Sequence, residues 1–243
     1  NPEIRCILMR PLGFSTGSLC RGDFEQAIQL LRSHRLEAIE LSALREDELE
    51  PLLSSINQLD LKHYRHVSLH APSRLVALSE SDLVRQLVPI TASEKCIVVH
   101  PDIIQDFALW RALGPALCIE NMDKRKPVGR SADELDYLFQ QLPQAKLCLD
   151  VGHSRQVDPS MLETWQILKI HGARLAEIHL SEVNCASEHE PLNRLAIRAF
   201  QRIAPLIPDE VPIILESPVS PDKIASEIRH ARQALPSRAL ISA

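Results

Sequence analysis

The chain lacks several features that mark membrane, secreted or nucleotide-binding proteins. Its apolar runs stay shorter than the roughly 18 to 20 residues that a membrane helix needs. Only 7 of its 243 residues are glycine, and no GxGxxG pattern follows the first expected strand, which argues against a dinucleotide-binding fold. The start, NPEIRCILMRPLG, does not have the layout of a signal peptide. We therefore expect a cytoplasmic protein with no membrane partner.

Clustered cysteines are also absent. The six cysteines are scattered without any CxxC pair: Cys6, Cys20, Cys96, Cys118, Cys148 and Cys185. Disulfide-rich secreted domains and Cys-rich zinc sites both need such clusters. A single thiol inside an apolar run packs as a small hydrophobe, so we expect Cys96, Cys118 and Cys148 to be buried and inert.

The chain has no excess of positive charge. Its formal net charge is −5, and 45% of its residues are hydrophobic and 24% charged, as in ordinary globular proteins. A negative chain is not drawn to a polyanion. Nucleic acid is therefore a possible partner, but the charge does not favour it.

Short runs rich in Val, Ile and Leu alternate with longer segments of helical period, which indicates repeated β-α units. Eight strands are expected, near residues 5–14, 37–42, 65–70, 95–100, 116–121, 145–150, 175–180 and 211–216. Helix starts are indicated at Gly22-Asp23, Ser131-x-x-Glu134, Asp158-Pro159 and Ser220-Pro221. The length suits one barrel of about 250 residues. The sequence thus predicts an α/β protein, a single (β/α)₈ TIM barrel over residues 1–243, with a doubly wound open sheet as the alternative.

Ionisable residues close most of these strands. The strand ends carry Glu40, His70, His100, Glu120, Asp150 followed by His153, His179 and Glu216. A barrel assembles its active site from the carboxyl ends of its strands, so these side chains should converge. Any one of them could be an ordinary loop cap or a hydrogen-bonded imidazole. Together, carboxylates crowded into one apolar mouth would repel each other without a cation.

This set of side chains predicts a divalent metal site. Carboxylates mixed with imidazoles suit Zn²⁺ best and also Mn²⁺. His189, ten residues after His179 on the following loop, is a further candidate ligand.

Basic residues follow the same strand ends. Arg74 follows His70, Lys124 opens the run Lys124-Arg125-Lys126 after Glu120, Arg155 follows His153, and Arg194 follows His189. Cations around a metal cluster would hold a phosphate or a carboxylate. We therefore predict Arg74, Lys124, Arg155 and Arg194 as ligands of a small anionic or sugar-like substrate.

From GFSTGSL through ILESP the chain resembles the xylose isomerase-like barrel superfamily. The isomerase and epimerase branch holds one metal with Glu, Asp, His and Glu from strands five to eight. Those positions match Glu120, Asp150, His179 and Glu216, and the resemblance implies that the two glutamates serve as catalytic acid and base.

The resemblance to the endonuclease IV branch is fuller. SLHAPS, VVHPD, DVGH and SEHEPL supply His70, His100, His153 and His189, which implies three zinc ions. One would use His70, His100 and Glu120, a second the four residues above, and a third His153 and His189. One departure is that Ser187 stands where an acid is expected two residues before His189.

Two enzymatic functions follow. The first is a metal-dependent hydrolase of a phosphate ester, with adjacent ions activating a water. It is favoured because His70 and His100 have no purpose in a one-metal site. The alternative is a sugar or sugar-phosphate isomerase or epimerase in which Glu120 and Glu216 move a proton. A barrel that only binds a ligand is a third reading.

Overall fold

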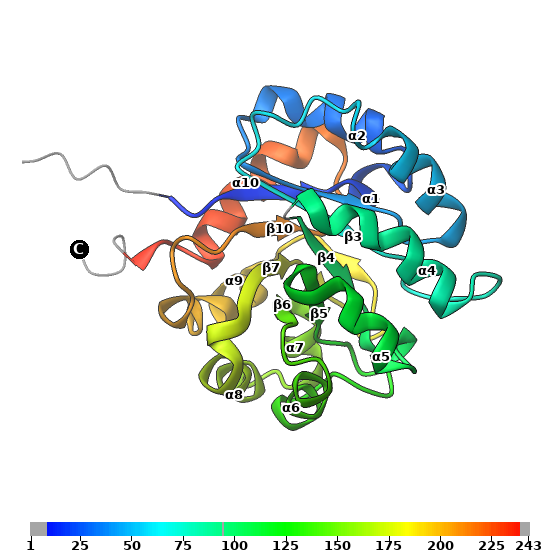
Figure 1. Ribbon diagram of the computed structural model, residues 1–243. Helices are drawn as coiled ribbons and strands as arrows, with labels where there is room; N and C mark the ends of the chain where they lie inside the picture. Colours follow the sequence, from blue (N-terminus) through cyan, green and yellow to red (C-terminus); the bar gives the residue numbers. More distant parts are fainter. Residues whose placement is uncertain (1–8, 94, 239–243) are drawn as a thin grey trace, which may run out of the picture.

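The computed structural model describes residues 9–93 and 95–238, and at its centre eight parallel strands close into a barrel (Figure 1). The order around the barrel is β1-β10-β7-β6-β5-β4-β3-β2. The strands are β1 (Leu12–Ser15), β2 (Ala38–Ser42), β3 (His66–His70), β4 (Cys96–Val99), β5 (Leu117–Glu120), β6 (Lys146–Asp150), β7 (Leu175–Leu180) and β10 (Ile213–Leu215). This architecture confirms the predicted (β/α)₈ barrel. Residues 5–8 of the first expected strand lie outside the described residues.

Helices surround the barrel on its outside (Figure 1). They are α1 (Thr16–Cys20), α2 (Phe24–Leu31), α3 (Glu46–Ser55), α4 (Glu80–Leu87), α5 (Phe107–Trp110), α6 (Ala132–Gln141), α7 (Val151–Val157), α8 (Leu162–His171), α9 (Arg194–Gln201) and α10 (Ile224–Ala234). Helix α2 buries Phe24, Ala27, Ile28 and Leu31, a spacing that puts apolar side chains on one helix face. Within the described residues, none of the helices is long and apolar enough to cross a bilayer.

Three of the four predicted helix starts lie at or within a turn of the observed ones. Asp23 accepts a hydrogen bond from the Gln26 amide at the start of α2, and Ser131 accepts one from Glu134 at the start of α6. A short 3-10 turn from Pro221 precedes α10. Helix α8 begins later than expected, at Leu162, because the Asp158 carboxylate first closes a turn through the Ser160 and Glu163 amides.

The expected burial of Cys96, Cys118 and Cys148 is confirmed, but the expectation of three free, inert thiols is wrong for two of them. Cys96 on β4 and Cys118 on β5 form a disulfide, with Cα atoms 6.0 Å apart, while Cys148 on β6 is a buried free thiol. Strands β4 and β5 are direct neighbours, so two cysteines facing the same way come within bridging distance. The pairing depends on strand register, which periodicity alone does not supply.

One small sheet lies outside the barrel. The chain after β7 forms an antiparallel pair, β8 (Glu182–Val183) with β9 (His189–Glu190). This hairpin places His189 beside Ser181, whose hydroxyl is 2.7 Å from His189 Nδ1. The hairpin therefore folds His189 back towards the carboxyl end of β7.

Candidate metal centre

The strand-end residues converge at the carboxyl ends of the barrel strands. Their ligand atoms form three overlapping groups, within each of which the atoms lie within 4.8 Å of one another. We call these the histidine group (His70, His100, Glu120), the four-ligand group (Glu120, Asp150, His179, Glu216) and the outer group (Asp150, His153, His189). All eight predicted metal ligands are thus brought together, although they are spread from β3 to the end of β10.

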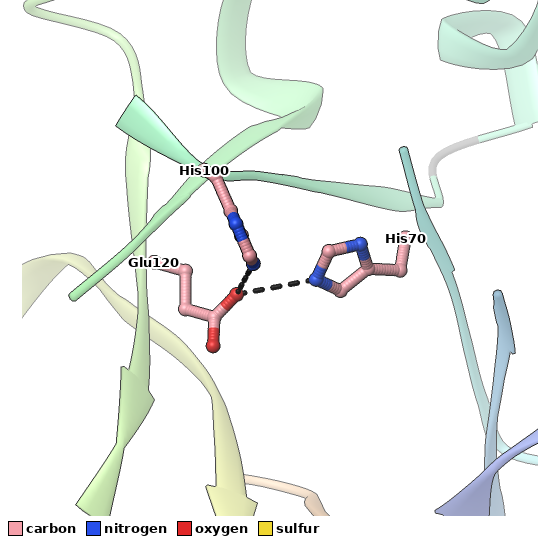
Figure 2. A group of neighbouring side chains, drawn as sticks. All are labelled: His70, His100 and Glu120. Atoms are coloured by element: carbon pink, nitrogen blue, oxygen red, sulfur yellow. Dashed lines mark hydrogen bonds and ion pairs between the residues drawn. The ribbon is translucent and has the colours of Figure 1, made fainter. Parts of the chain in front are cut away.

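In the histidine group two imidazoles point at one oxygen of Glu120 (Figure 2). His70 Nε2 is 3.2 Å and His100 Nε2 is 3.1 Å from Glu120 Oε2. His70 ends β3, His100 directly follows β4, and Glu120 ends β5, so three neighbouring strands supply the group. Such convergence of nitrogen and oxygen donors on one point is what a small cation needs.

The proton on His70 can be assigned from its partners. Its Nδ1 lies 2.7 Å from the Ala71 carbonyl, which can only accept, so Nδ1–H donates to it. In the neutral ring, Nε2 then presents a lone pair to the Glu120 carboxylate. Burial lowers the pKa of His70, but the bond to Glu120 and the charge of Glu40 outweigh it and raise the pKa. Either a proton or a metal ion must lie between the two groups, and a metal ion satisfies both.

The four-ligand group concentrates negative charge around one imidazole. His179 Nδ1 lies 3.4 Å from Glu120 Oε1 and 3.4 Å from Glu216 Oε1. Asp150 Oδ2, His179 Nδ1 and Glu216 Oε2 are buried and have no hydrogen-bond partner among the described residues. Buried polar atoms are normally paired, so orphaned donor atoms aimed at one point fit a divalent cation.

The pKa directions have the same origin. Burial raises the pKa of Glu216 well above its ordinary value, and Glu120 and Asp150 add to the rise against the opposing effect of His179. Burial lowers the pKa of His179, but the acidic groups around it, Cys148 and Glu216 foremost, raise it well above its ordinary value. Without a metal ion, Glu216 and His179 therefore hold protons, which offset the negative charge of this cluster as a bound cation would.

The outer group is the least buried of the three. His153 lies in the first turn of α7, where Nδ1 is 3.0 Å from the Asn121 carbonyl, and the ring centroids of His153 and His189 are 5.2 Å apart. Burial lowers the pKa of His189 to about 4, which leaves its imidazole neutral and able to bind a metal at neutral pH. Asp150 is the only carboxylate among the three members of this group.

Ser187, at the position where the resemblance implies an acid, has another role in this chain. It is buried, adopts a left-handed conformation with φ 59°, and its Oγ accepts a hydrogen bond of 2.6 Å from Gln156 Nε2. Its carbonyl accepts a hydrogen bond from Arg125. Ser187 therefore ties the hairpin to neighbouring segments and adds no charge to the outer group.

A cavity of about 910 Å³ opens over these groups. Its floor includes His70, His100, Glu120, His153, His189 and Glu216, and its rim carries the cations Arg45, Arg74, Arg125 and Lys126 and the acids Glu46, Asp47, Asp102 and Asp123. Lys126 Nζ is 2.7 Å from Asp102 Oδ2, and Arg125 pairs with Asp123. The rim is therefore a mixture of both charges, with most cations already paired.

Of the four predicted substrate-binding cations, the structure brings only Arg74 to the cavity. Lys124 is exposed to solvent away from the cavity lining, whereas the next two residues of its run do line it. Arg155 forms an ion pair with Glu182, and Arg194 begins α9 on an exposed face. A basic residue that is close in sequence to a proposed metal ligand therefore does not necessarily line the cavity.

The residues behind the cluster were not identified from the sequence. Cys148 and Glu177 lie together with His179 in a fourth compact group inside the barrel. Glu177 stands two residues before His179 on β7, so both side chains point to the same face of the strand. That spacing indicates that Glu177 lies beside His179, although an acid in the middle of a strand more often faces solvent.

Solved structures share this arrangement of strands and helices. Endonuclease IV from Thermus thermophilus is 20% identical over 93% of this chain and 98% of its own, with a TM-score of 0.57. The 3-keto-D-glucoside 4-epimerase from E. coli is 11% identical over 90% and 99%, with a TM-score of 0.60. A xylose isomerase-like TIM barrel protein from Mycobacterium smegmatis, in complex with magnesium, is 10% identical over 93% and 98%, with a TM-score of 0.55.

No family model and no curated protein matches the chain by sequence. At these low identities the structural likeness establishes the fold, and the buried groups of His, Glu and Asp side chains fit divalent metal binding on their own geometry. The chain therefore has the fold of the xylose isomerase-like TIM barrels, as the resemblance of its strand-end motifs implied.

Proposed function

We propose that the protein is a hydrolase of small phosphate esters that uses a multinuclear metal centre, with zinc as its ion. The observation that carries the proposal is the sharing of Glu120. One of its oxygens meets His70 and His100, and the other faces His179 Nδ1. A carboxylate shared in this way supports two adjacent cation sites, which is the arrangement that phosphoryl-transfer enzymes use.

The residues of the chain would divide the work. Glu120, Asp150, His179 and Glu216 would hold one ion, His70 and His100 would complete a second site with Glu120, and His153 and His189 with Asp150 offer a third. When bound, such ions supply Lewis acidity, which activates water as a nucleophile near neutral pH and offsets charge on a phosphoryl group.

The cavity rim supports a small anionic substrate rather than duplex DNA. Arg74 faces the cavity, and no hydrogen bond or ion pair joins it to another described residue, so it is available to a phosphate. Four acids share the rim with the cations, and the whole chain carries a net charge of −5. A polyanion would meet repulsion there, whereas a single phosphate group can select the cations.

Metal analysis followed by ester hydrolysis tests this function. We expect two or more zinc ions per chain by mass spectrometry, and hydrolysis of p-nitrophenyl phosphate or its bis-ester that a chelator abolishes and zinc restores. A duplex with an abasic site serves as the comparison substrate and should be cleaved poorly. One exchangeable Mn²⁺ per chain, with no ester hydrolysed, would contradict the proposal.

A second candidate is a sugar or sugar-phosphate isomerase or epimerase. It is favoured by the four-ligand group, which is complete without the histidine group and places Glu120 and Glu216 each 3.4 Å from His179 Nδ1. Two such glutamates could remove and return a proton. In deuterated buffer this activity would place deuterium on a substrate carbon, so a panel of sugar phosphates without exchange would exclude it.

A further inference from the structure

Two carboxylates lie behind the metal centre, on the side of His179 that faces away from it. While His179 Nδ1 faces Glu120 and Glu216, its Nε2 lies 3.2 Å from Glu177 Oε1 and 3.0 Å from Glu40 Oε2. Both carboxylates are 0% exposed, and neither belongs to the three groups that face the cavity. A TIM barrel is normally filled by branched apolar side chains, so two acids here call for a physical reason.

Glu177 is the carboxylate that holds the ring. The contact of His179 Nε2 with Glu177 has hydrogen-bond geometry, whereas Glu40 Oε2 has no hydrogen-bond partner among the described residues. Glu40 is bonded instead through its other oxygen, which accepts from Ser42 Oγ at 3.2 Å. Because Nε2–H donates to Glu177, the lone pair of Nδ1 is directed at the metal centre.

Glu177 is itself anchored from the opposite end of the barrel. Its Oε2 forms an ion pair with His66 Nε2, and His66 is the first residue of β3, the strand whose last residue is His70. The His66 side chain is 22% exposed and lines a separate cavity of about 320 Å³. Burial alone would raise the pKa of Glu177, but its contacts with His66 and with His179 together lower it to about 2.

We propose that Glu177 is a positioning residue for His179, and that His66 keeps Glu177 in place. The inference rests on the metal site proposed above. A carboxylate behind a ligating imidazole fixes its tautomer and the direction of its ring, and loss of such a partner typically weakens metal binding by about 10- to 100-fold. Strand β3 thus contributes to the metal centre at both ends. Its last residue, His70, is a proposed ligand, and its first residue, His66, holds the carboxylate that positions His179.

The test replaces Glu177 together with its ion-pair partner His66. His66→Leu combined with Glu177→Leu removes both ions, and exchanging a buried ion pair for apolar side chains is often neutral or stabilising. Glu177→Gln keeps an oxygen acceptor for His179 and removes only the charge. Glu80→Gln is the matched control, because Glu80 binds the Trp110 indole and two backbone amides outside the barrel.

Zinc affinity is measured on the full-length protein by competition with a chromophoric chelator, and ligand geometry by the visible absorption of the cobalt-substituted form. We expect the double variant to fold, to bind zinc about 10- to 100-fold more weakly, and to show a shifted cobalt spectrum. Glu177→Gln should lose less affinity, and Glu80→Gln should lose none.

Each outcome decides between the two proposals. A folded double variant with wild-type affinity and an unchanged cobalt spectrum overturns the positioning role alone. If the double variant does not fold, Glu177→Gln decides: a several-fold loss of affinity supports the role, and wild-type affinity overturns it. Wild-type protein that takes up neither zinc nor cobalt would overturn the metal site and this inference with it.

Discussion

Glu120 belongs to both the histidine group and the four-ligand group, as Asp150 belongs to both the four-ligand group and the outer group. Burial raises the pKa of the Glu120 carboxyl, but His100 and His179 outweigh burial and hold it well below its ordinary value. It is therefore an anion with imidazoles on both oxygens. Metal binding at both groups should respond to this one residue.

Glu120→Gln tests that dependence. An amide cannot bridge two cations as a carboxylate does, so we expect bound zinc to fall by more than one ion per chain in mass spectrometry, with the barrel still folded by circular dichroism. Glu134 lies on α6 and forms an ion pair with Arg130, so Glu134→Gln is the control and should keep its full metal content. Loss of one ion or fewer from Glu120→Gln would show that the two groups do not share it.

Single residues differed in how far the sequence could place them. His70, Glu120 and Asp150 each end an apolar run, so their convergence follows from the barrel alone. Glu177 lies inside a strand, and only its spacing of two residues from His179 indicates that it faces the barrel interior. The Cys96–Cys118 disulfide depends on two strands being aligned, which no local pattern encodes.

Among the elements, α3 is tied to the loop after β3 by one side chain. The Glu46 carboxylate at the start of α3 accepts hydrogen bonds from the amides of Val76, Ala77 and Leu78, at 2.7, 3.0 and 2.9 Å. These three bonds hold the pKa of Glu46 below its ordinary value. The loop borders the cavity, so this tie shapes the rim next to Arg74.

Glu46→Gln should loosen that loop. We expect several-fold faster amide hydrogen exchange at residues 76–78, measured by NMR at constant pH, because a neutral amide accepts more weakly than a carboxylate. Asp47→Asn is the control, since Asp47 is the exposed neighbour of Glu46 and forms an ion pair of 3.6 Å with Arg45. Equal exchange in both variants would argue against the tie.

The same tie should depend on pH. Because the folded-state pKa of Glu46 is depressed, its contribution is complete above the unfolded-state pKa and is lost as the pH falls through the folded-state pKa. The carboxyl carbon of Glu46 should therefore titrate below about 4.3, the usual glutamate value. A midpoint at or above that value would contradict the hydrogen bonds.

At Gly13, strand β1 lies so close to the backbone of β2 that no side chain would fit there. A Cβ at Gly13 would lie 1.8 Å from the Ala38 carbonyl oxygen, which is backbone and cannot move aside. Gly172, in contrast, has no atom within 4 Å of the place where a Cβ would be, and its φ is −58°. The two glycines therefore form a matched pair.

Gly13→Ala should destabilise the protein by about 3 kcal/mol or more, since overpacking costs about 1–3 kcal/mol even where side chains can give way. Gly172→Ala should be neutral or stabilise by about 0.4–1 kcal/mol. Urea unfolding followed by circular dichroism measures both. Equal stability of the two variants would mean that β1 and β2 can separate at no cost.

At the scale of the whole molecule, the barrel concentrates negative charge at one mouth. Glu120, Asp150 and Glu216 come within reach of one another only in the folded state, so a cation that binds them there binds the unfolded chain far less. Ligands that bind only the folded state stabilise it by about 2.7 kcal/mol at 100 times Kd. Metal content should therefore control the thermal stability of the protein.

Chelation tests this link. Removing metal should lower Tm by about 5 °C or more, given roughly 2–4 °C per kcal/mol for a chain of this size, and added zinc should restore it. Scanning calorimetry of the treated and reloaded protein gives both values. An unchanged Tm would show that the cluster is neutralised by protons rather than by a bound ion.

The whole fold was more accessible to prediction than its details. Eight apolar runs separated by helical segments suffice for a barrel, because strands buried on both faces must be covered by the helices that join them. The start of α8 and the direction of Arg155 depended instead on local hydrogen bonds and ion pairs, of Asp158 in one case and Glu182 in the other. The hydrophobic periodicity of a sequence does not show which nearby group a polar side chain will bind.

Closure through β1 and β10 also sets an order of events during synthesis. Leu12 pairs with Ile213 and Phe14 with Leu215, so β1 lacks one of its two neighbours until β10 has been synthesised. Until that strand leaves the ribosome, the nascent chain carries two open sheet edges that can associate with other chains. Glu216 directly follows the same strand, so the four-ligand group becomes complete just as those edges are sealed.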